Sequence, residues 1–451
     1  MPRTWPASPF QHTIMTNDGT IPSGSTGPHM TMSISALVTG GLDVDLLDAA
    51  YDDLVARNDV LRTTLEPDGE QWRQRVHPHR TAHLHRAEAA APEAQSFVDA
   101  WSREPVPIDR PPLVRGQVVA LDDGSHLVNL VFHHVHTDPP SLVLAVAELG
   151  ALYTARLAGE PLPPPPLQYG PYSARRAAIT APTLDADLDH WRTTVEGARP
   201  LDLSPSRDLS TPPDSGVLRL DVLDGRDAAA LEKWALRRRT TVFATLFTAF
   251  CLAAADRSTT RDVLVNTVFE QRAHPDVRTL IGPFLHPSVL RVRVPEGATW
   301  SSMTPVVREA VGAAYARAHV PGFDVLRLHP DVIHAVETEP VGLCVFQYLP
   351  YSGLEDTFAY GPATARVLAR TQAGPTGDVG LMFRLHRRSS GSLYATVTYD
   401  RRDLTEPVVR ALFTDFTTRL REPLAERAPR TGSPSRPRDT AAPQRDSAPV
   451  T

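Results

Sequence analysis

The stretch LVNLVFHHVHTDPPSLVLAVAELGALYTARLA, residues 127–158, decides how this chain folds and where its polar chemistry lies. Its first six residues are apolar apart from Asn129, and a short run of this kind is typical of a buried strand. The polar residues that follow therefore lie at the edge of a core, where burial can tune their protonation. Because side chains alternate faces along a strand, only one of His133 and His134 can face a given cavity. If the strand continues, His136 shares the face of His134.

A helix is predicted directly after the histidines. Asp138 is a good N-cap residue, and Pro139 suits the first helical position, where a missing N–H costs little. Apolar residues recur at helical spacing from Leu142 to Tyr153, and Gly159 marks the end of the helix. The N-terminus of this helix is thus aimed near the histidines, where it could stabilise an oxyanion.

Length and composition indicate a globular protein of two lobes. A chain of 451 residues is too long for one ordinary core. The net charge of -6 gives no reason to expect nucleic acid or an anionic membrane as a partner. Cys251 and Cys344 lie in apolar contexts and look like small core residues, which fits a reducing compartment. With no signal-peptide pattern and no run of eighteen apolar residues, we expect a soluble, cytoplasmic protein.

Strands and helices alternate along the chain, which predicts a mixed α/β fold with mixed sheets. The predicted strands are 32–38, 60–65, 71–76, 81–86, 114–121, 127–134, 263–268, 289–294, 342–348, 379–386 and 392–399, and the further predicted helices are 43–58, 92–101, 226–237, 241–255, 305–318 and 406–420. The proline run at 161–166 should be stiff, and with the loop through residue 180 it joins the halves. We therefore divide the chain into a first lobe, 1–175, a second lobe, 176–426, and a disordered tail, 427–451.

Four stretches resemble one known family, in the family's order. HHVHTDP at 133–139 resembles the HHxxxDG motif of the condensation domains of nonribosomal peptide synthetases, a signature shared with related ester-forming acyltransferases. RNDVLRTTL at 57–65, YGPYSARR at 169–176 and EQRAHPDVRTLIGPFLHPSVLRVRV at 270–294 are similar to other segments of that family. The resemblance covers roughly residues 8–424. No DFGWG-like segment occurs, which argues against the plant-type acyltransferases.

The resemblance implies two chloramphenicol-acetyltransferase-like lobes that form a V-shaped pseudo-dimer with a central tunnel. A phosphopantetheine-borne acyl donor on a carrier protein would enter from one side and a small-molecule acceptor from the other, with no bound cofactor, and we expect a monomer. The motif's second histidine, His134, would be the catalytic base. The motif's aspartate, Asp138, usually pairs with an arginine, and Arg62 occupies a matching place; a role as helix cap carries similar weight.

The other polar residues of the motif have competing interpretations. His133 would be structural, and His136 either lines the site or is a solvated turn residue. Ser141 and Ser288 could line the site. These two serines and Cys344 lack a GxSxG elbow, so we do not expect a covalent nucleophile. Because adjacent strand residues diverge and no HExxH or CxxC spacing occurs, we expect no metal site.

The sequence departs from the motif at its last position, where Pro139 replaces glycine and Pro140 follows. Proline has no N–H, so any oxyanion donor supplied by that amide is lost. We predict a free-standing condensation enzyme that joins a carrier-tethered acyl or aminoacyl thioester to an amine or alcohol, forming an amide or ester in natural-product biosynthesis. The alternatives are a catalytically silent platform that binds carrier or tailoring proteins, and an acyltransferase that uses coenzyme A.

Overall fold

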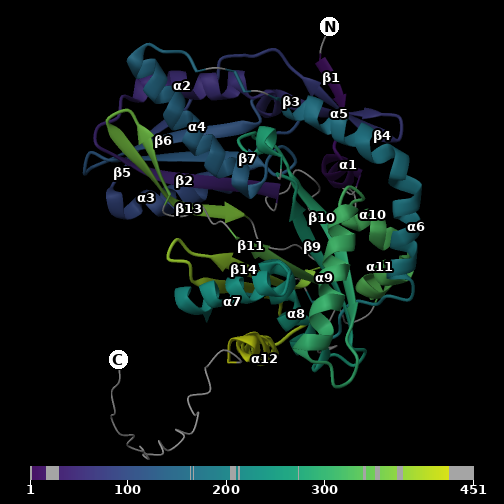
Figure 1. Cartoon of the computed structure of the whole chain (residues 1–451). Helices are drawn as coiled ribbons and strands as arrows, with labels where there is room; N and C mark the ends of the chain where they lie inside the picture. Colours follow the sequence, from purple (N-terminus) through teal and green to yellow (C-terminus); the bar gives the residue numbers. More distant parts are fainter. Residues whose placement is uncertain are drawn as a thin grey trace, which may run out of the picture.

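The computed structural model describes residues 3–16, 30–162, 164–165, 167–203, 210–211, 214–272, 274–338, 342–350, 356–372 and 379–425. The predicted tail, 427–451, lies outside the described residues. Within them the chain forms two six-stranded sheets and one three-stranded sheet, with helices packed against the two large sheets (Figure 1). The predicted mixed α/β fold is confirmed.

The first large sheet is built mostly from the N-terminal part of the chain. Its order is β12 (Thr357–Tyr360), β13 (Ala363–Gln372), β2 (Thr31–Thr39), β7 (His126–His133), β6 (Val114–Leu121) and β5 (His85–Ala89). Helices α2 (Val44–Arg57) and α4 (Pro139–Ala158) cover one face, and α3 (Ala94–Ser102) packs on the other. Among the described helices, only α4 is long and apolar enough to cross a membrane, and half of it is buried, as is usual for a core helix.

The second large sheet has the order β10 (Leu285–Arg293), β9 (Asp262–Glu270), β11 (Leu343–Leu349), β14 (Val379–Arg387), β15 (Leu393–Asp400) and β8 (Ser215–Leu223). One face packs against α7 (Gly225–Arg237), α8 (Val242–Ala255), α9 (Trp300–Ala316) and α12 (Glu406–Ala425). Aromatic rings fill this core: the centroids of Phe250 and Phe346 lie 4.9 Å apart, and those of Phe383 and Phe416 lie 5.0 Å apart. In Figure 1, α7 and α12 lie on the side of β14 away from β13.

Two strands cross from the second half of the chain into the first sheet. β12 and β13 come from residues 357–372, yet β13 pairs antiparallel with β2. Tyr360, at the end of β12, is fully buried, and its hydroxyl donates to the carbonyl of Val146 in α4 at 2.9 Å. A division of the chain at residue 175 misses this crossover, because pairing between distant segments leaves no local pattern. The V shape and the tunnel stay predictions.

Most predicted elements are confirmed, with small differences at their ends. Residues 59–62 form a short 3-10 helix instead of a strand, and the strand expected at 81–86 is β5 at 85–89. Helix α9 begins at Trp300, ahead of Pro305, because Thr299 and Ser302 form a capping box there. The described elements that the sequence did not predict are β1 (Arg3–Pro6), α1 (Pro9–Thr16), α5 (Tyr169–Thr180), α6 (Leu184–Val195), β8, α10 (Gly322–Arg327), α11 (Pro330–Thr338), β12 and β13.

Candidate active site

Strand β7 ends at His133, and the next three residues form a turn. The amide of His134 donates to the carbonyl of Met30 at 2.7 Å, and the amide of His136 donates to the carbonyl of His133 at 3.1 Å. The condition under which His134 and His136 would share one strand face, that the strand continues, is therefore not met, because the strand ends and the chain turns.

The side chain of His134 is held in one orientation. Its Nδ1 lies 2.9 Å from the carbonyl oxygen of Thr137, and its ring centroid lies 5.2 Å from that of Phe10 in α1. A carbonyl oxygen only accepts, so Nδ1 carries the proton and Nε2 of the neutral ring keeps a free lone pair. His134 remains partly exposed, so Nε2 is placed to accept a proton.

The charges and packing around His134 favour the neutral ring. Burial lowers its pKa below the usual 6.5, and the positive charge of Arg384 lowers it further, while the Thr137 carbonyl and Asp138 oppose this shift. An imidazole with a lowered pKa is already deprotonated at neutral pH, so His134 can act as a base there.

The two neighbouring histidines are buried. His133 Nδ1 accepts from the amide of Val135 at 3.1 Å, and the carbonyl of His133 accepts from Thr137 Oγ1 at 3.2 Å, so His133 stabilises the turn. His136 is fully buried, and neither ring nitrogen has a hydrogen-bond partner among the described residues. Burial, with His133 nearby, lowers the pKa of His136 well below 6.5. The interpretation of His136 as a solvated turn residue is therefore wrong.

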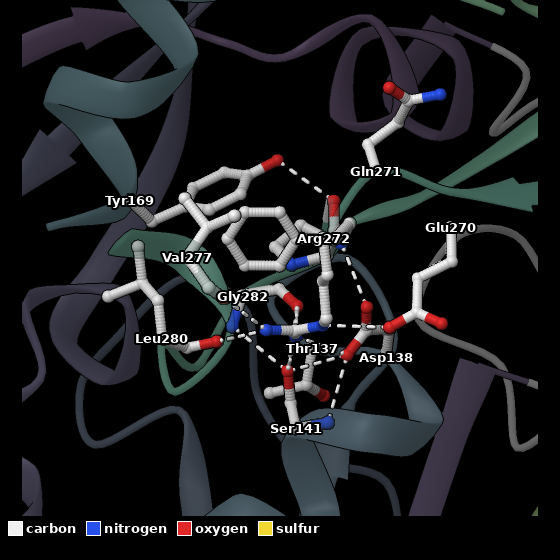
Figure 2. Close-up of polar contacts among 12 residues, drawn as sticks. Thr137, Asp138, Ser141, Tyr169, Glu270, Gln271, Arg272, Val277, Leu280 and Gly282 are labelled. Atoms are coloured by element: carbon white, nitrogen blue, oxygen red, sulfur yellow. Dashed lines mark hydrogen bonds and ion pairs between the residues drawn. The ribbon is translucent and has the colours of Figure 1, made fainter. Parts of the chain in front are cut away.

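Asp138 both caps α4 and pairs with an arginine, as Figure 2 shows. Its Oδ1 accepts from the Ser141 amide at 2.9 Å and from Arg272 Nη2 at 2.8 Å, and its Oδ2 accepts from the Phe284 amide at 3.0 Å. The predicted pairing with Arg62 is wrong. Arg62 instead donates to Asp59 at 2.5 Å, because the 3-10 helix places these two side chains on one short turn.

Arg272 forms hydrogen bonds to several groups of the turn that follows β9. Its Nη1 donates to the carbonyls of Val277 at 2.9 Å and Leu280 at 2.6 Å, and its guanidinium lies 4.1 Å from the centre of the Phe284 ring. The whole residue is only 8% exposed. We call Asp138, Ser141, Arg272 and Gly282 the clasp, because they join the N-terminus of α4 to this turn of the second half of the chain.

Ser141 is a structural member of the clasp. Its Oγ lies 2.6 Å from Asp138 Oδ1 and 2.8 Å from the Gly282 carbonyl, and it accepts from Arg272 Nη2 at 2.7 Å. Tyr169 closes the other side: its hydroxyl donates to the Pro283 carbonyl at 3.0 Å, and its ring lies 2.4 Å from where a Cβ on Gly282 would be. Only glycine fits at position 282 of the clasp, because a Cβ there would collide with this ring.

The N-terminus of α4 offers no free amide for an oxyanion. Pro139 and Pro140 have no N–H, and the amide of Ser141 is taken by Asp138. The sequence-based expectation of an oxyanion site at this helix end is therefore not met by its first three residues. Charge that develops on a substrate oxygen must be stabilised by other groups.

A pocket of about 330 Å³ adjoins the clasp. One wall is apolar and comes from α4 and β12, with Pro140, Val143, Leu144 and Phe358; the other carries Glu270, Arg272 and Arg278. Burial, together with the nearby Asp138, raises the pKa of Glu270, which Arg272 opposes. The pocket can receive a ligand with an apolar body and a polar end.

The remaining candidates, Ser288 and the two cysteines, are buried. Ser288 is fully buried in β10, where its backbone lies 3.1 Å from a Cβ placed on Gly322. Cys251 and Cys344 are buried, and burial raises the pKa of both thiols, so neither is a ready nucleophile. Within the described residues, no three His, Cys, Asp or Glu side chains come together as a metal ion would require.

Sequence reasoning missed two arginines of the site. Arg272 stands inside the quoted stretch 270–294, but its pairing with Asp138 spans 134 positions of the chain. Arg384, whose positive charge is one cause of the lowered pKa of His134, interrupts the apolar strand β14, and this interruption was the only signal of it in the sequence.

Comparison with known families supports the interpretation of the motif. A family model described as Condensation domain matches residues 5–357. The chain is 29% identical over 306 residues to phosphinothricin tripeptide synthetase PhsC of Streptomyces viridochromogenes, an alignment that covers 65% of this chain and 28% of that protein. It is 26% identical over 302 residues to cyclosporin synthetase simA of Tolypocladium inflatum, covering 64% of this chain and 2% of that one. The chain thus matches less than a third of the length of these synthetases.

Solved structures share the fold. SgcC5 of Streptomyces globisporus has a TM-score of 0.75 at 23% identity, covering 93% of this chain and 99% of that one. The X-domain from teicoplanin biosynthesis has a TM-score of 0.76 at 19% identity, covering 94% and 96%. The first condensation domain of the calcium-dependent antibiotic synthetase has a TM-score of 0.72 at 20% identity, covering 93% and 96%. Because the family model spans most of the chain and the fold agrees with it, the protein belongs to the condensation domain family of nonribosomal peptide biosynthesis.

Proposed function

We propose that the protein is a condensation enzyme. It transfers an acyl or aminoacyl group from the phosphopantetheine thioester of a carrier protein to the amine or alcohol of a small acceptor, which forms an amide or an ester. The peptide synthetases among its relatives support a carrier-borne donor. Action as a free-standing monomer stays a prediction, which the mass of the native protein would check. Location in the cytoplasm also stays a prediction.

The observation that carries this proposal is the hydrogen bond between His134 Nδ1 and the Thr137 carbonyl at 2.9 Å. It leaves Nε2 as the basic nitrogen of a ring whose pKa is lowered. Nε2 removes the proton of the acceptor as its oxygen or nitrogen attacks the thioester carbonyl. The new C–O or C–N bond forms, the C–S bond breaks, and the imidazolium returns the proton to the leaving thiolate.

A second candidate function is a silent platform that binds other proteins. It is favoured by Pro139 and Pro140, which remove amide donors beside the base, and by a similar fold in an X-domain that was solved in complex with OxyB from teicoplanin biosynthesis, with a TM-score of 0.73. The accessible, oriented His134 favours the enzyme.

The experiment compares the wild-type protein with His134→Ala and with His83→Ala, a change at an exposed histidine. Each is incubated with carrier proteins loaded with a panel of aminoacyl groups and with amine and alcohol acceptors, and products are measured by mass spectrometry. We expect His134→Ala to lower turnover of an alcohol by roughly 10²–10⁴-fold, and His83→Ala to leave it unchanged. Unchanged turnover in His134→Ala would remove the base from the mechanism.

The donor form is tested in the same assay. We expect product from the carrier-bound thioester and little from the same acyl group on coenzyme A. Equal rates from both would favour an acyltransferase that uses coenzyme A. Tight binding of loaded carrier without any product, unaffected by His134→Ala, would favour the platform.

A further inference from the structure

The first turn of α1 contains a side chain with two separate partners. Ser8 is the N-cap of this helix, and Gln11 stands three positions after the cap. The amide of Gln11 donates to Ser8 Oγ at 3.2 Å, and the amide of Ser8 donates to Gln11 Oε1 at 3.0 Å, which forms a capping box. The box uses the oxygen of the Gln11 side chain and leaves its amino group, Nε2, for another partner.

The second partner belongs to the turn that carries the proposed base. Nε2 of Gln11 donates to the carbonyl of Val135 at 3.2 Å. Val135 directly follows His134, and both Gln11 and Val135 are fully buried. The orientation of the Gln11 side-chain amide follows from its partners, since Oε1 faces an N–H and Nε2 faces a carbonyl. A glutamate would serve the capping box equally well, so the contact with Val135 is what calls for an amide.

Phe10, the neighbour of Gln11, contacts the base itself. Its ring centroid lies 5.2 Å from that of His134, and Phe10 is only 6% exposed. The side chain of Val135 packs into the same small apolar cluster as Phe10 and Ile14. The first turn of α1 thus packs against the base and holds both the side chain and the carbonyl of the next residue.

The turn after β7 decides which ring nitrogen of His134 is basic. Nδ1 lies 2.9 Å from the Thr137 carbonyl and therefore carries the proton. This arrangement depends on where the chain places that carbonyl relative to the ring. The peptide of Val135 lies between the two residues, so a hydrogen bond that fixes the Val135 carbonyl restricts the path of the chain from His134 to Thr137.

We propose that Gln11 is a positioning residue for His134. By holding the Val135 carbonyl, it keeps the Thr137 carbonyl within reach of Nδ1, and so keeps the lone pair of the ring on Nε2. Gln11 contacts no substrate, because its side chain is fully buried between α1 and the turn. This inference rests on the proposed function, in which His134 is the base.

The tautomer of His134 can be observed without turnover. In protein with isotope-labelled histidine, NMR shows which ring nitrogen carries the proton at a pH where the ring is neutral. We expect the wild type to be protonated at Nδ1. Gln11→Met keeps a side chain of similar shape but removes the donor, and we expect a second population protonated at Nε2. A single form protonated at Nδ1 in Gln11→Met would overturn the proposal.

Gln11→Glu tests the donor within one folded protein. Its carboxyl group still accepts from the Ser8 amide. While protonated it also donates an O–H to the Val135 carbonyl, and once ionised it has no donor left. Burial raises the pKa of a carboxyl group, so the spectra are recorded from about pH 6 to about pH 10. We expect the form protonated at Nε2 to appear as the carboxyl ionises; an unchanged tautomer across the series would overturn the proposal.

Gln168→Met is the matched control. Gln168 makes the same pair of contacts elsewhere: its Oε1 accepts from the Asp59 amide at 3.0 Å, and its Nε2 donates to the Arg57 carbonyl at 3.3 Å. Removing these contacts should destabilise the protein without changing the tautomer of His134. The same tautomer shift in Gln168→Met would assign the effect to a general loosening of the fold and would overturn the proposal.

The kinetic test separates the position of the base from substrate binding. We expect Gln11→Met to lower kcat for an alcohol acceptor by roughly 10–10²-fold, because a small displacement of a reacting group has an effect of this size. KM should stay unchanged, since Gln11 acts on the base and not on the bound substrate. Gln168→Met should keep the kcat of the wild type. A rise in KM at unchanged kcat would show that Gln11 shapes the binding site and would overturn the proposal.

The two proposals fail in different ways. If His134→Ala keeps full turnover while Gln11→Met shifts the tautomer, His134 is not the base, although Gln11 does hold its ring. If His134 is essential while its tautomer ignores both changes at Gln11, the base stands and positioning by Gln11 is wrong.

Discussion

At the scale of single residues, the site depends on the protonation of one imidazole. His134 is oriented by the Thr137 carbonyl, and burial together with Arg384 lowers its pKa. A depressed pKa means that the base is available in its neutral form at pH values where an ordinary histidine is partly charged.

The pH profile of the reaction should reflect this shift. With an alcohol acceptor, we expect kcat/KM to fall on acidification at a lower pH than an unperturbed histidine would give, since protonation removes the base and its pKa is lowered. In Arg384→Gln the fall should move to higher pH, because a positive neighbour is gone. A profile that falls already above 7 would contradict the lowered pKa of His134.

A second buried histidine links stability to pH. Burial lowers the pKa of His286 to about 4, although its Nδ1 lies 3.2 Å from the Ala318 carbonyl. Unfolding restores a pKa near 6.5, so the unfolded chain takes up the proton first. The contribution of this group is present above pH 6.5 and is lost as the pH falls towards 4, by about 3 kcal/mol in total. His286→Gln should flatten the dependence of the free energy of unfolding on pH in this window; an unchanged slope would contradict it.

At the scale of elements, the clasp decides how α4 meets the turn after β9. Asp138 satisfies the helix N-terminus and Arg272 together, and both side chains are buried. The sequence predicted the cap correctly because capping is local. The sequence pointed to Arg62 instead of Arg272 as the partner, because a contact between residues far apart in the chain produces no local sequence pattern.

Breaking the clasp should cost stability more than its hydrogen bonds suggest. Arg272→Met leaves the Asp138 carboxylate buried without its cation, which we expect to lower the free energy of unfolding by roughly 3–5 kcal/mol. Urea unfolding measures this, with Arg388→Gln as an exposed control expected within about 0.5 kcal/mol of the wild type. A loss below about 1 kcal/mol for Arg272→Met, the net worth of one ordinary hydrogen bond, would show that the clasp adds little.

Two glycines give a matched test of the packing. Gly282→Ala places a Cβ 2.4 Å from the Tyr169 ring, whereas a Cβ on Gly312 in α9 meets nothing within 4 Å. We expect Gly282→Ala to destabilise the protein by about 1–3 kcal/mol and Gly312→Ala to stabilise it by up to about 1 kcal/mol. Thermal unfolding shows whether each variant is more or less stable than the wild type. A change in the same direction for both variants would contradict this account of the site.

The elements that the sequence missed share a physical reason. Helix α5 forms where the sequence predicted a loop through residue 180, and α6 forms where it predicted no element; both helices are polar enough to hide the helical period. They are stabilised by packing, with Tyr169 and Trp191 each 1% exposed. Strong local patterns, as in β6 and α8, were predicted almost to the residue.

At the scale of the whole molecule, β13 makes the two halves interdependent. The first sheet needs residues 357–372 to cover the edge of β2, and an uncovered edge strand is prone to pair with other chains. We therefore expect residues 1–175 expressed alone to aggregate or to remain partly unfolded, while the full chain unfolds in one transition. Circular dichroism and size-exclusion chromatography would check this; a stable, monomeric fragment would contradict it.

The same crossover sets an order of events on the ribosome. β2 emerges early, but its neighbour at one edge is encoded far downstream, at residues 363–372. Until residue 372 has left the exit tunnel, the first sheet of the nascent chain is incomplete and the edge of β2 is unpaired. A chaperone that binds unpaired strand edges can act during that interval.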